Sequence, residues 1–390
     1  MNWISLYEEY TATHEAPSIF HTWVGISTVA AMLERKVWKR LMFDDIYPNM
    51  YVILVAPPGR CRKSSAISIG SRILSELQGV TLGVERTTPE SLIQDIEMAE
   101  SYFDIGPRVY GHCSLTCISK ELDTLMSVKP EDMLKLLTDL YDSQVHDIWT
   151  YKTKGSGMNR ITGVWLNLLG GTVPDFFQGP LIQRSIGLGF TSRCIFVFAD
   201  RRRHRSLDCD DRLVRKLQKG MEEIHKLRGE FFFDAPGEVF FRDWYLNLPN
   251  EAETIEALSP YYERKHVHVI KLSMILSACE GGNNMTIGKQ HIQSALRILE
   301  KTEAKMTRVF GGTGRAPTAP DSDRILQQIA MARGGISEAS LIERNYKQID
   351  LPPLRMLLET FVSMNMVRLD IKNGQKWYTY IGRDSDGHKC

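Results

Sequence analysis

The sequence predicts an α/β fold whose mainly parallel sheet is covered by helices on both faces. Between residues 41 and 205, short apolar runs of strand type alternate with segments of helical period, which is typical of such a sheet. One run, residues 51–56, is apolar throughout, as expected for a strand buried on both faces. Pro57, Pro58 and Gly59 end this run, and a helical period begins at Ser64. We therefore expect a strand, a loop and a helix in direct succession at the start of the sheet.

Length and composition are those of a globular protein. The 390 residues are enough for one sizeable domain and one or two small ones. Hydrophobic residues make up 43% of the chain and charged residues 24%, an ordinary globular composition for which disorder is not the default expectation. Because 48 Lys and Arg face 47 Asp and Glu, any surface for nucleic acid must be local.

The cysteines and the apolar runs indicate the compartment. Seven cysteines are scattered along the chain without a CxxC pair or a zinc-like spacing, which suits a reducing cytosol. No N-terminal segment of signal type and no apolar run of ~18 residues is present. These features predict a cytoplasmic protein with no membrane contact.

The loop after the first buried strand has the chemistry of a phosphate site. A helix N-terminus presents unpaired N–H groups and the positive end of its dipole, so it attracts anions. Lys63 would reach the β- and γ-phosphates of a nucleotide, and the Ser64 hydroxyl would hold Mg²⁺. The usual two glycines are missing, because Pro57 and Arg62 stand in their places. The alternative is an ordinary strand-to-helix turn with a surface lysine. The candidate binding residues of the loop are Gly59, Arg60, Cys61, Arg62, Lys63, Ser64 and Ser65.

An ATPase also needs a carboxylate at the end of a strand adjacent to this loop, where it would orient or deprotonate the attacking water. A strand is predicted within residues 108–118, and Glu121 follows it closely. Glu121 is thus the candidate catalytic residue and, with Ser64, a candidate metal ligand. The alternative is a surface glutamate that begins a helix.

Three further candidates flank two later strands. Polar side chains at the C-terminal end of a central strand point into the ligand crevice, so Asn167 or Thr172 would sense the γ-phosphate. A capping role for Thr172 explains that residue equally well. Arg193 precedes a last strand, residues 194–198, and would stabilise the charge of phosphoryl transfer, acting from a neighbouring subunit. The alternative for Arg193 is a salt-bridge partner.

Helices are expected on either side of the sheet domain. Residues 1–40 are predicted to form an N-terminal helical cap, and the basic cluster at residues 35–40 is interpreted as its solvated face. A helix is predicted over residues 130–142. Residues 206–310 are predicted to be mainly helical, with a short hairpin at the aromatic runs between residues 231 and 241.

The C-terminal part has the pattern of a separate small domain. Residues 311–321 form a linker by composition. Three helices are predicted over residues 323–332, 338–346 and 354–364, followed by a hairpin around Asn373 and Gly374. Three helices and a hairpin make a winged helix, here over residues 322–385. Its third helix carries only one basic residue, so the wing would contact phosphates, or the module would bind protein.

Seven segments in order resemble the RecA-like ATPase domains of phage and mobile-element primase–helicase proteins, over roughly residues 10–305. The segments are YPNMY (47–51), RKS (62–64), RTTPESL (86–92), SKEL (119–122), LLGGTVPD (168–175), GFTSR (189–193) and YERKHVHVIKL (262–272). The resemblance implies a P-loop NTPase core over residues 41–205 and a helical lid over residues 206–310. Lys63 and Ser64 match the family's phosphate and Mg²⁺ ligands, Glu121 its catalytic carboxylate, and Arg193 its candidate arginine finger. One departure is Lys120, since the family has Asp-Glu where this chain has Lys-Glu.

The function that the resemblance implies is an ATP-hydrolysing, nucleic-acid-acting motor. It would use ATP and Mg²⁺, form a ring such as a hexamer, and translocate as a helicase on single-stranded DNA during replication of a phage or mobile element. A replication protein would dock on the winged helix. The alternative is an ATP-dependent switch or helicase loader that recruits a partner without translocating, and a third reading is a structural DNA-binding protein with a decayed nucleotide site. No primase signature is visible, so nucleic-acid synthesis is not expected.

Overall fold

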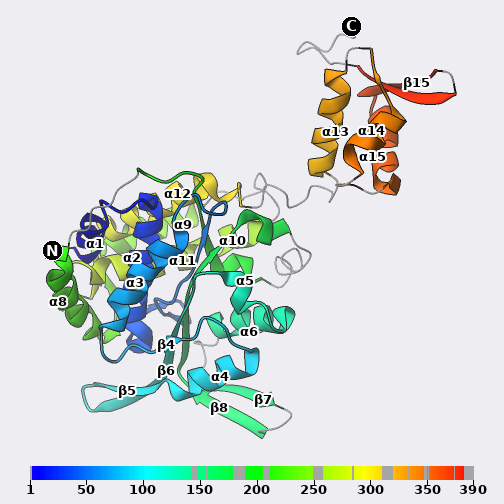
Figure 1. The fold of residues 1–390 in the computed structure, drawn as a ribbon. Coiled ribbons are helices and arrows are strands. Elements are labelled where there is room, and N and C mark those ends of the chain that lie inside the picture. Colours follow the sequence, from blue (N-terminus) through cyan, green and yellow to red (C-terminus); the bar gives the residue numbers. More distant parts are fainter. Residues whose placement is uncertain are drawn as a thin grey trace. The chain divides into compact units, whose positions relative to one another are not determined.

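The structure is a computed structural model. It describes residues 2–142, 148–153, 157–178, 189–204, 211–248, 258–282, 285–309, 319–332, 334–346, 349, 351–372 and 374–381. The chain divides into two compact units, Met1–Gly311 and Gly312–Cys390, and each is described by itself (Figure 1).

The first unit is built on a six-stranded, mainly parallel sheet, as the sequence predicts. Five parallel strands follow one another in the order β10-β3-β9-β6-β4, and β5 pairs antiparallel with β6. All residues of β3, β9 and β10 are buried, which explains why their sequences are apolar rather than alternating. The bounds are β3 (Tyr51–Val55), β4 (Leu82–Gly83), β5 (Glu100–Ile105), β6 (Arg108–Ser119), β9 (Val164–Thr172) and β10 (Cys194–Phe198).

Helices cover both faces of this sheet (Figure 1). On β9, a Cβ added to Gly171 would meet Ile67 of α3, whereas one added to Gly170 would meet Leu122 of α5. Because successive strand residues point to opposite faces, α3 and α5 lie on opposite sides. The helices around the sheet are α1 (Trp3–Tyr10), α2 (Ser18–Leu33), α3 (Lys63–Ser75), α4 (Pro89–Met98), α5 (Leu122–Leu125) and α6 (Pro130–Asp142), the last with the bounds predicted.

The rest of the first unit is mainly helical, also as predicted. It contains α8 (Val214–His225), α9 (Ala235–Leu246), α10 (Ser259–Glu263), α11 (Lys265–Ala278) and α12 (Lys289–Met306). The hairpin expected between residues 231 and 241 is wrong. Residues 239–241 lie in α9, and β12 (Phe232–Phe233) pairs instead with β13 (Thr286–Ile287). The reason is a strong helix start: the Asp234 side chain accepts from the Gly237 N–H, and a proline follows in the first turn.

The basic cluster at residues 35–40 is not a solvated face, which corrects the expectation. Arg35, Lys36 and Lys39 are buried, and only Arg40 is exposed. Lys36 forms an ion pair of 2.9 Å with Glu34, which is buried beside it. A buried counter-charge of this kind lowers the free-energy cost of burying a lysine. The sequence pattern of the cluster, which is mostly basic, does not indicate this pairing.

Short strands complete the first unit. They are β1 (Val37–Leu41), β2 (Asp44–Ile46) and β11 (Gly229–Glu230), which form one three-stranded sheet, and the hairpin of β7 (Ile148–Thr153) and β8 (Gly157–Thr162). Short 3₁₀ turns occur at Glu34–Lys36, Pro174–Gln178, Thr191–Arg193 and Asp211–Leu213.

The second unit contains the three helices and two hairpin strands that the sequence predicts. Its elements are α13 (Ala319–Met331), β14 (Ile336–Ser337), α14 (Glu338–Asn345), α15 (Leu351–Ser363), β15 (Val367–Lys372) and β16 (Gln375–Tyr380). The strands form one antiparallel sheet in the order β14-β16-β15. Buried side chains from all three helices and from the sheet, among them Ile329, Leu341, Leu358 and Tyr378, form its own hydrophobic core. Of the predicted turn, Asn373 lies outside the described residues.

Candidate functional site

The loop that follows β3 has the backbone shape of a glycine-rich loop, although it has one glycine. Gly59 has a φ of +68° and Arg62 a φ of +52°, so both lie in the left-handed region. This conformation costs a non-glycine residue on the order of 1–2 kcal/mol. Arg62 is held in it by Glu15, whose Oε2 lies 2.9 Å from the Arg62 Nε. Arg62 therefore occupies a glycine-like position by means of a partner on another segment.

Lys63 is the first residue of α3, and its side chain folds back over the loop. Its Nζ donates a hydrogen bond of 2.7 Å to the carbonyl oxygen of Ala56, the residue that follows β3. Burial lowers the pKa of Lys63, whereas Cys61 and the Glu121 carboxylate raise it. The ammonium group thus lies against the start of the loop, at the Ala56 carbonyl, and it interacts electrostatically with the Glu121 carboxylate.

The other loop residues differ in how far they are exposed to solvent. Ser64 and Ser65 are exposed at the start of α3, and Gly59 and Arg60 are exposed in the loop. Cys61 is buried, and its Sγ lies 3.5 Å from the carbonyl oxygen of Ala199. Burial raises the pKa of the Cys61 thiol, which keeps it protonated. Of Cys61, the backbone and not the thiol can therefore face a ligand, and its place among the binding residues of the loop stays a prediction.

Glu121 lies close enough to the loop for its charge to act on Lys63, although the strand order differs from the one expected. β9 lies between β3 and β6, so Glu121 follows a strand that is not adjacent to β3, contrary to the expectation. Gly171, near the end of β9, lets the turn that precedes Glu121 approach β9 closely. A Cβ there would lie 2.7 Å from the Lys120 carbonyl oxygen and 3.1 Å from the Ile67 Cδ1. Because Gly171 has no side chain, the turn before Glu121 rests directly on β9 and faces α3.

A second carboxylate, that of Asp123, interacts with Glu121 and was not among the residues predicted from the sequence. Asp123 is in the first turn of α5, and desolvation and the Glu121 charge raise its pKa. Lys120, which stands where the family has aspartate, instead forms an ion pair of 3.2 Å with Glu85. Asp123 therefore offers at this turn the second carboxylate that Lys120 does not.

Thr172 lies where the loop begins. It is the last residue of β9, opposite Val55, and its carbonyl oxygen accepts a hydrogen bond of 3.3 Å from the Ala56 N–H. Its hydroxyl is buried and has no hydrogen-bond partner within the part of the chain that the structure describes. A buried hydroxyl without a partner is costly and calls for a ligand or water. The capping alternative for Thr172 finds no hydrogen bond in its favour among these residues.

Asn167 does not belong to this site, which corrects the expectation that it lies at the C-terminal end of its strand. It precedes Leu168, the residue opposite Tyr51, and so lies near the amino end of β3. Its Oδ1 accepts from the Met50 N–H at 3.0 Å, and its Nδ2 donates to the Ser27 carbonyl oxygen at 3.2 Å. The side chain is fully buried and ties β3 to α2, so its polar groups are already used.

Arg193 also lies away from the loop of its own chain. It immediately precedes β10, whose first residue pairs with Tyr51 at the amino end of β3. Its guanidinium contacts Asp142 and donates a hydrogen bond of 2.6 Å to the Gly189 carbonyl oxygen. Arg264 binds the same carboxylate with bonds of 3.0 and 3.1 Å. Within this chain, the salt-bridge alternative describes Arg193.

The N-terminal segment between α1 and α2 contacts the loop, a contact that no sequence pattern predicts. His14 Nε2 lies 2.8 Å from the Ser65 hydroxyl, and His14 Nδ1 lies 2.9 Å from His21 Nε2. Burial lowers the pKa of His21 to about 3, and the pKa of His14 is lowered as well. Glu15 binds Arg62 and also Arg202, at 3.4 Å. The lowered pKa values favour the neutral form of both histidines, which form a hydrogen-bonded chain that leads to α3.

The donor set at the loop suits Mg²⁺ bound together with phosphate. The Ser64 hydroxyl and the Glu121 carboxylate, whose charge reaches Lys63, are oxygen ligands of the kind that Mg²⁺ prefers, and Mg²⁺ usually takes few ligands from the protein. Among the described residues, no group of three or more His, Cys, Asp or Glu side chains is placed to hold a metal without such a substrate.

None of the described helices combines the length and the apolar character that crossing a bilayer requires. Comparison of the sequence with protein-family models and with curated proteins finds no match.

Proposed function

We propose that this protein binds ATP with Mg²⁺ at the loop between β3 and α3 and hydrolyses it to act on nucleic acid. The observation that carries the proposal is Lys63. This residue is the first of α3, its Nζ lies over the loop at 2.7 Å from the Ala56 carbonyl oxygen, and the Glu121 charge reaches it. A lysine that bonds a loop carbonyl can exchange that bond for a phosphate oxygen.

Each residue of the site has a role in this proposal. The N–H groups at the start of α3 and Lys63 bind the phosphates, and Ser64 with Glu121 holds Mg²⁺, which would neutralise phosphate charge when bound. Glu121 orients or deprotonates the attacking water, and Asp123 supports it. The Thr172 hydroxyl, which has no hydrogen-bond partner among the described residues, senses the γ-phosphate.

The finer architecture belongs to the same proposal. The first unit would be a RecA-like P-loop core with a helical cap and a helical lid, and the second unit a winged helix. The active form would be a ring, such as a hexamer, that translocates on single-stranded DNA in replication of a phage or mobile element. Arg193 enters only as a residue for a neighbouring subunit's site, since Asp142 and Gly189 occupy it here.

A second candidate is an ATP-dependent switch or helicase loader, and the surface of α15 favours it. Arg355, the basic residue of this helix, is paired with Glu338 at 2.7 Å, and Met356 is 59% exposed. On the hairpin, Arg368 is paired with Asp370 at 3.1 Å. A helix with paired charge and exposed apolar side chains suits a protein partner better than DNA.

Steady-state ATP hydrolysis tests the proposal. The wild type, Lys63→Ala and the control Lys135→Ala, an exposed lysine on α6, are each measured with and without single-stranded DNA. We expect the wild type and Lys135→Ala to turn over and to be stimulated by DNA, and Lys63→Ala to be inactive. Turnover by Lys63→Ala at the wild-type rate would refute the site.

The two candidate functions differ in a second measurement. Glu121→Gln should retain ATP in either case, because binding precedes hydrolysis. A motor should show DNA-stimulated turnover and assemble into a ring in sedimentation with ATP. A switch should bind ATP, hydrolyse it without response to DNA, and change its affinity for a partner protein.

A further inference from the structure

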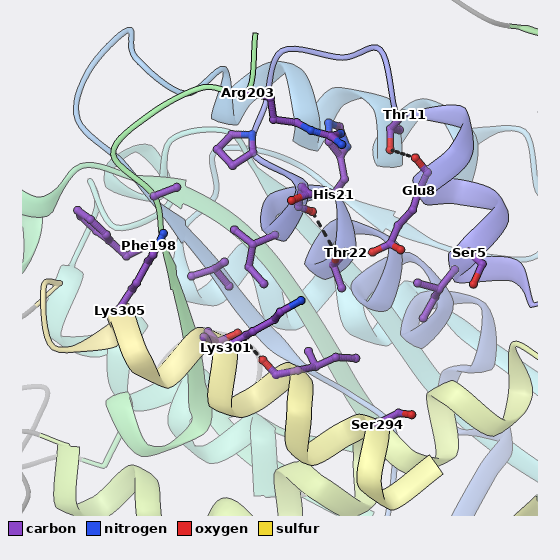
Figure 2. A pocket seen from close by; sticks show the side chains of 18 of the residues that line it. Ser5, Glu8, Thr11, His21, Thr22, Phe198, Arg203, Ser294, Lys301 and Lys305 are labelled. Carbon is purple, nitrogen blue, oxygen red and sulfur yellow. Dashed lines mark hydrogen bonds between the residues drawn. The ribbon is translucent and has the colours of Figure 1, made fainter. Parts of the chain in front are cut away.

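A large pocket in the first unit lies apart from the loop after β3. It has a volume of about 880 Å³ and is bounded by α1, α2, the segment that follows β10, and α12 (Figure 2). A volume near this value accommodates a molecule of nucleotide size. The proposed function does not use this pocket.

The pocket is lined by unbalanced positive charge. Arg201 and Arg203 come from the segment after β10, and Lys301 and Lys305 come from α12. No carboxylate of the described residues forms an ion pair with any of these four, which distinguishes them from Arg62, Arg193 and Arg264. Two carboxylates also line the pocket, but both are engaged: Asp200 pairs with Arg308 at 3.3 Å, and Glu8 accepts the Thr22 hydroxyl.

The two lysines are arranged for a ligand with more than one negative charge. Lys301 and Lys305 are four residues apart on α12, so their side chains emerge from the same face, about 5–6 Å apart at Cβ. Both extend from α12 toward the space beneath Arg203 and His21 (Figure 2). Like charges at this spacing destabilise a helix, and a bound polyanion would remove that cost.

The remainder of the lining is amphiphilic. Ile4, Ile19, Val197, Leu276 and Ile298 supply an apolar surface, and the hydroxyls of Ser5, Ser18 and Thr22 supply neutral hydrogen-bonding groups. An inorganic ion would need only the cations. An apolar wall next to clustered cations and hydroxyls suits an organic molecule with phosphate groups.

The N-terminal segment contacts both the loop and the wall of this pocket, and no loop residue from 57 to 65 lines the pocket. Residues 13–15 contact the loop side through His14 on Ser65 and Glu15 on Arg62. The same residues contact the other side, where the Glu15 carbonyl oxygen accepts from the Arg203 N–H at 3.0 Å. A ligand bound among the four cations is therefore distinct from one bound at the loop.

From this geometry we propose that the pocket is a second anion site, which binds a small organic polyphosphate between Lys301, Lys305 and Arg203. A nucleotide and a non-nucleotide polyphosphate share this chemistry. The site does not depend on ATP hydrolysis at the loop, so it can be tested after the loop has been disabled.

The test is isothermal titration calorimetry in a Lys63→Ala background at low ionic strength, with tripolyphosphate and ATP as separate ligands. The test variant adds Lys301→Ala and Lys305→Ala. The matched control adds Lys135→Ala and Lys226→Ala, which remove the same charge from exposed positions on α6 and after α8. Thermal melts of all variants verify folding, since none of these lysines is buried.

We expect binding in the Lys63→Ala background and in the control, and affinity at least about tenfold lower in the test variant, which corresponds to about 1.4 kcal/mol. Equal affinities for the two ligands would identify the phosphates alone as the determinant, and tighter binding of ATP would add the apolar wall; both support the site. Equal loss in the control, or no binding in the Lys63→Ala background, would refute it. Binding of a single-stranded oligonucleotide there, without tripolyphosphate binding, would also refute it.

Discussion

Replacing Gly171 with alanine should push the turn that carries Glu121 away from β9. A Cβ at this position lies 2.7 Å from the Lys120 carbonyl oxygen, and ordinary van der Waals contact begins at 3.4 Å, so the turn must move by about 0.7 Å. The Ile67 Cδ1, at 3.1 Å on the α3 side, leaves little room to share this movement. Overpacking of this kind costs about 1–3 kcal/mol, so we expect the free energy of unfolding to fall by that amount.

Gly170→Ala is the matched control. It is the neighbouring residue on the same strand, and the nearest atom to an added Cβ is the Leu122 Cδ1 at 3.4 Å, an ordinary contact. Loss of a glycine restricts the unfolded chain, so this variant should be unchanged or more stable by up to about 1 kcal/mol. Replacing glycine with alanine changes the intrinsic strand propensity equally in both variants, so this contribution cancels when their free energies of unfolding are compared.

Urea unfolding followed by tryptophan fluorescence measures the difference. Six of the seven tryptophans lie in residues 1–311, so the signal reports mainly on the first unit. ATP hydrolysis is measured on the same samples below the unfolding transition, where Gly171→Ala should be several-fold slower and Gly170→Ala unchanged. If Gly171→Ala is as stable as Gly170→Ala, the close approach of the turn to β9 is wrong.

Three further predictions concern polar groups that are buried or partly buried. Burial lowers the pKa of His268 to about 3, so the unfolded chain takes up a proton between about pH 6.5 and pH 3 that the folded chain does not, and stability falls as the pH falls through this window. His268→Gln should therefore lessen the decrease in the free energy of unfolding from pH 7 to pH 4, by up to about 1.4 kcal/mol per pH unit, and an unchanged profile in urea unfolding would contradict this. Asp142→Asn leaves Arg193 without its counter-charge and should cost about 1–3 kcal/mol in urea unfolding, less than for a fully buried pair because the Asp142 side chain is 36% exposed. Asn167→Ala removes the acceptor of the Met50 N–H and should cost about 1–3 kcal/mol, with no specific effect on ATP binding beyond that of lower stability.

Local sequence pattern was sufficient for the elements whose signal is local. The apolar run at the start of the sheet is β3, residues 194–198 are β10, and the amphipathic run 130–142 is α6. In each case the periodicity, or its absence, follows from how many faces of the element are buried. The hairpin expected between residues 231 and 241 is wrong because the Asp234 cap begins a helix, which includes the second aromatic run.

The candidate site was predicted in part. Lys63 and Thr172 lie at the same end of the sheet, and the Glu121 charge reaches Lys63, so these three are brought together. Asn167 and Arg193 lie toward the opposite end of the strands. The positions of Asn167 and Arg193 along the sheet depend on the register of β9 and β10 against β3. This register cannot be predicted from a single sequence.

What the sequence by itself determined is therefore the α/β class, the strand, loop and helix around Lys63, and the helices and hairpin of the second unit, because each depends on contacts between residues near in sequence. Only the tertiary structure decided the rest. It inserted β9 between β3 and β6, brought the Lys120 carbonyl, just before Glu121, onto Gly171, paired Arg193 with Asp142, and placed the segment of His14 and Glu15 on the loop. These are contacts between segments far apart in the chain, and their partners are selected by packing and by the need to satisfy buried charge, neither of which leaves a periodic signal in the sequence.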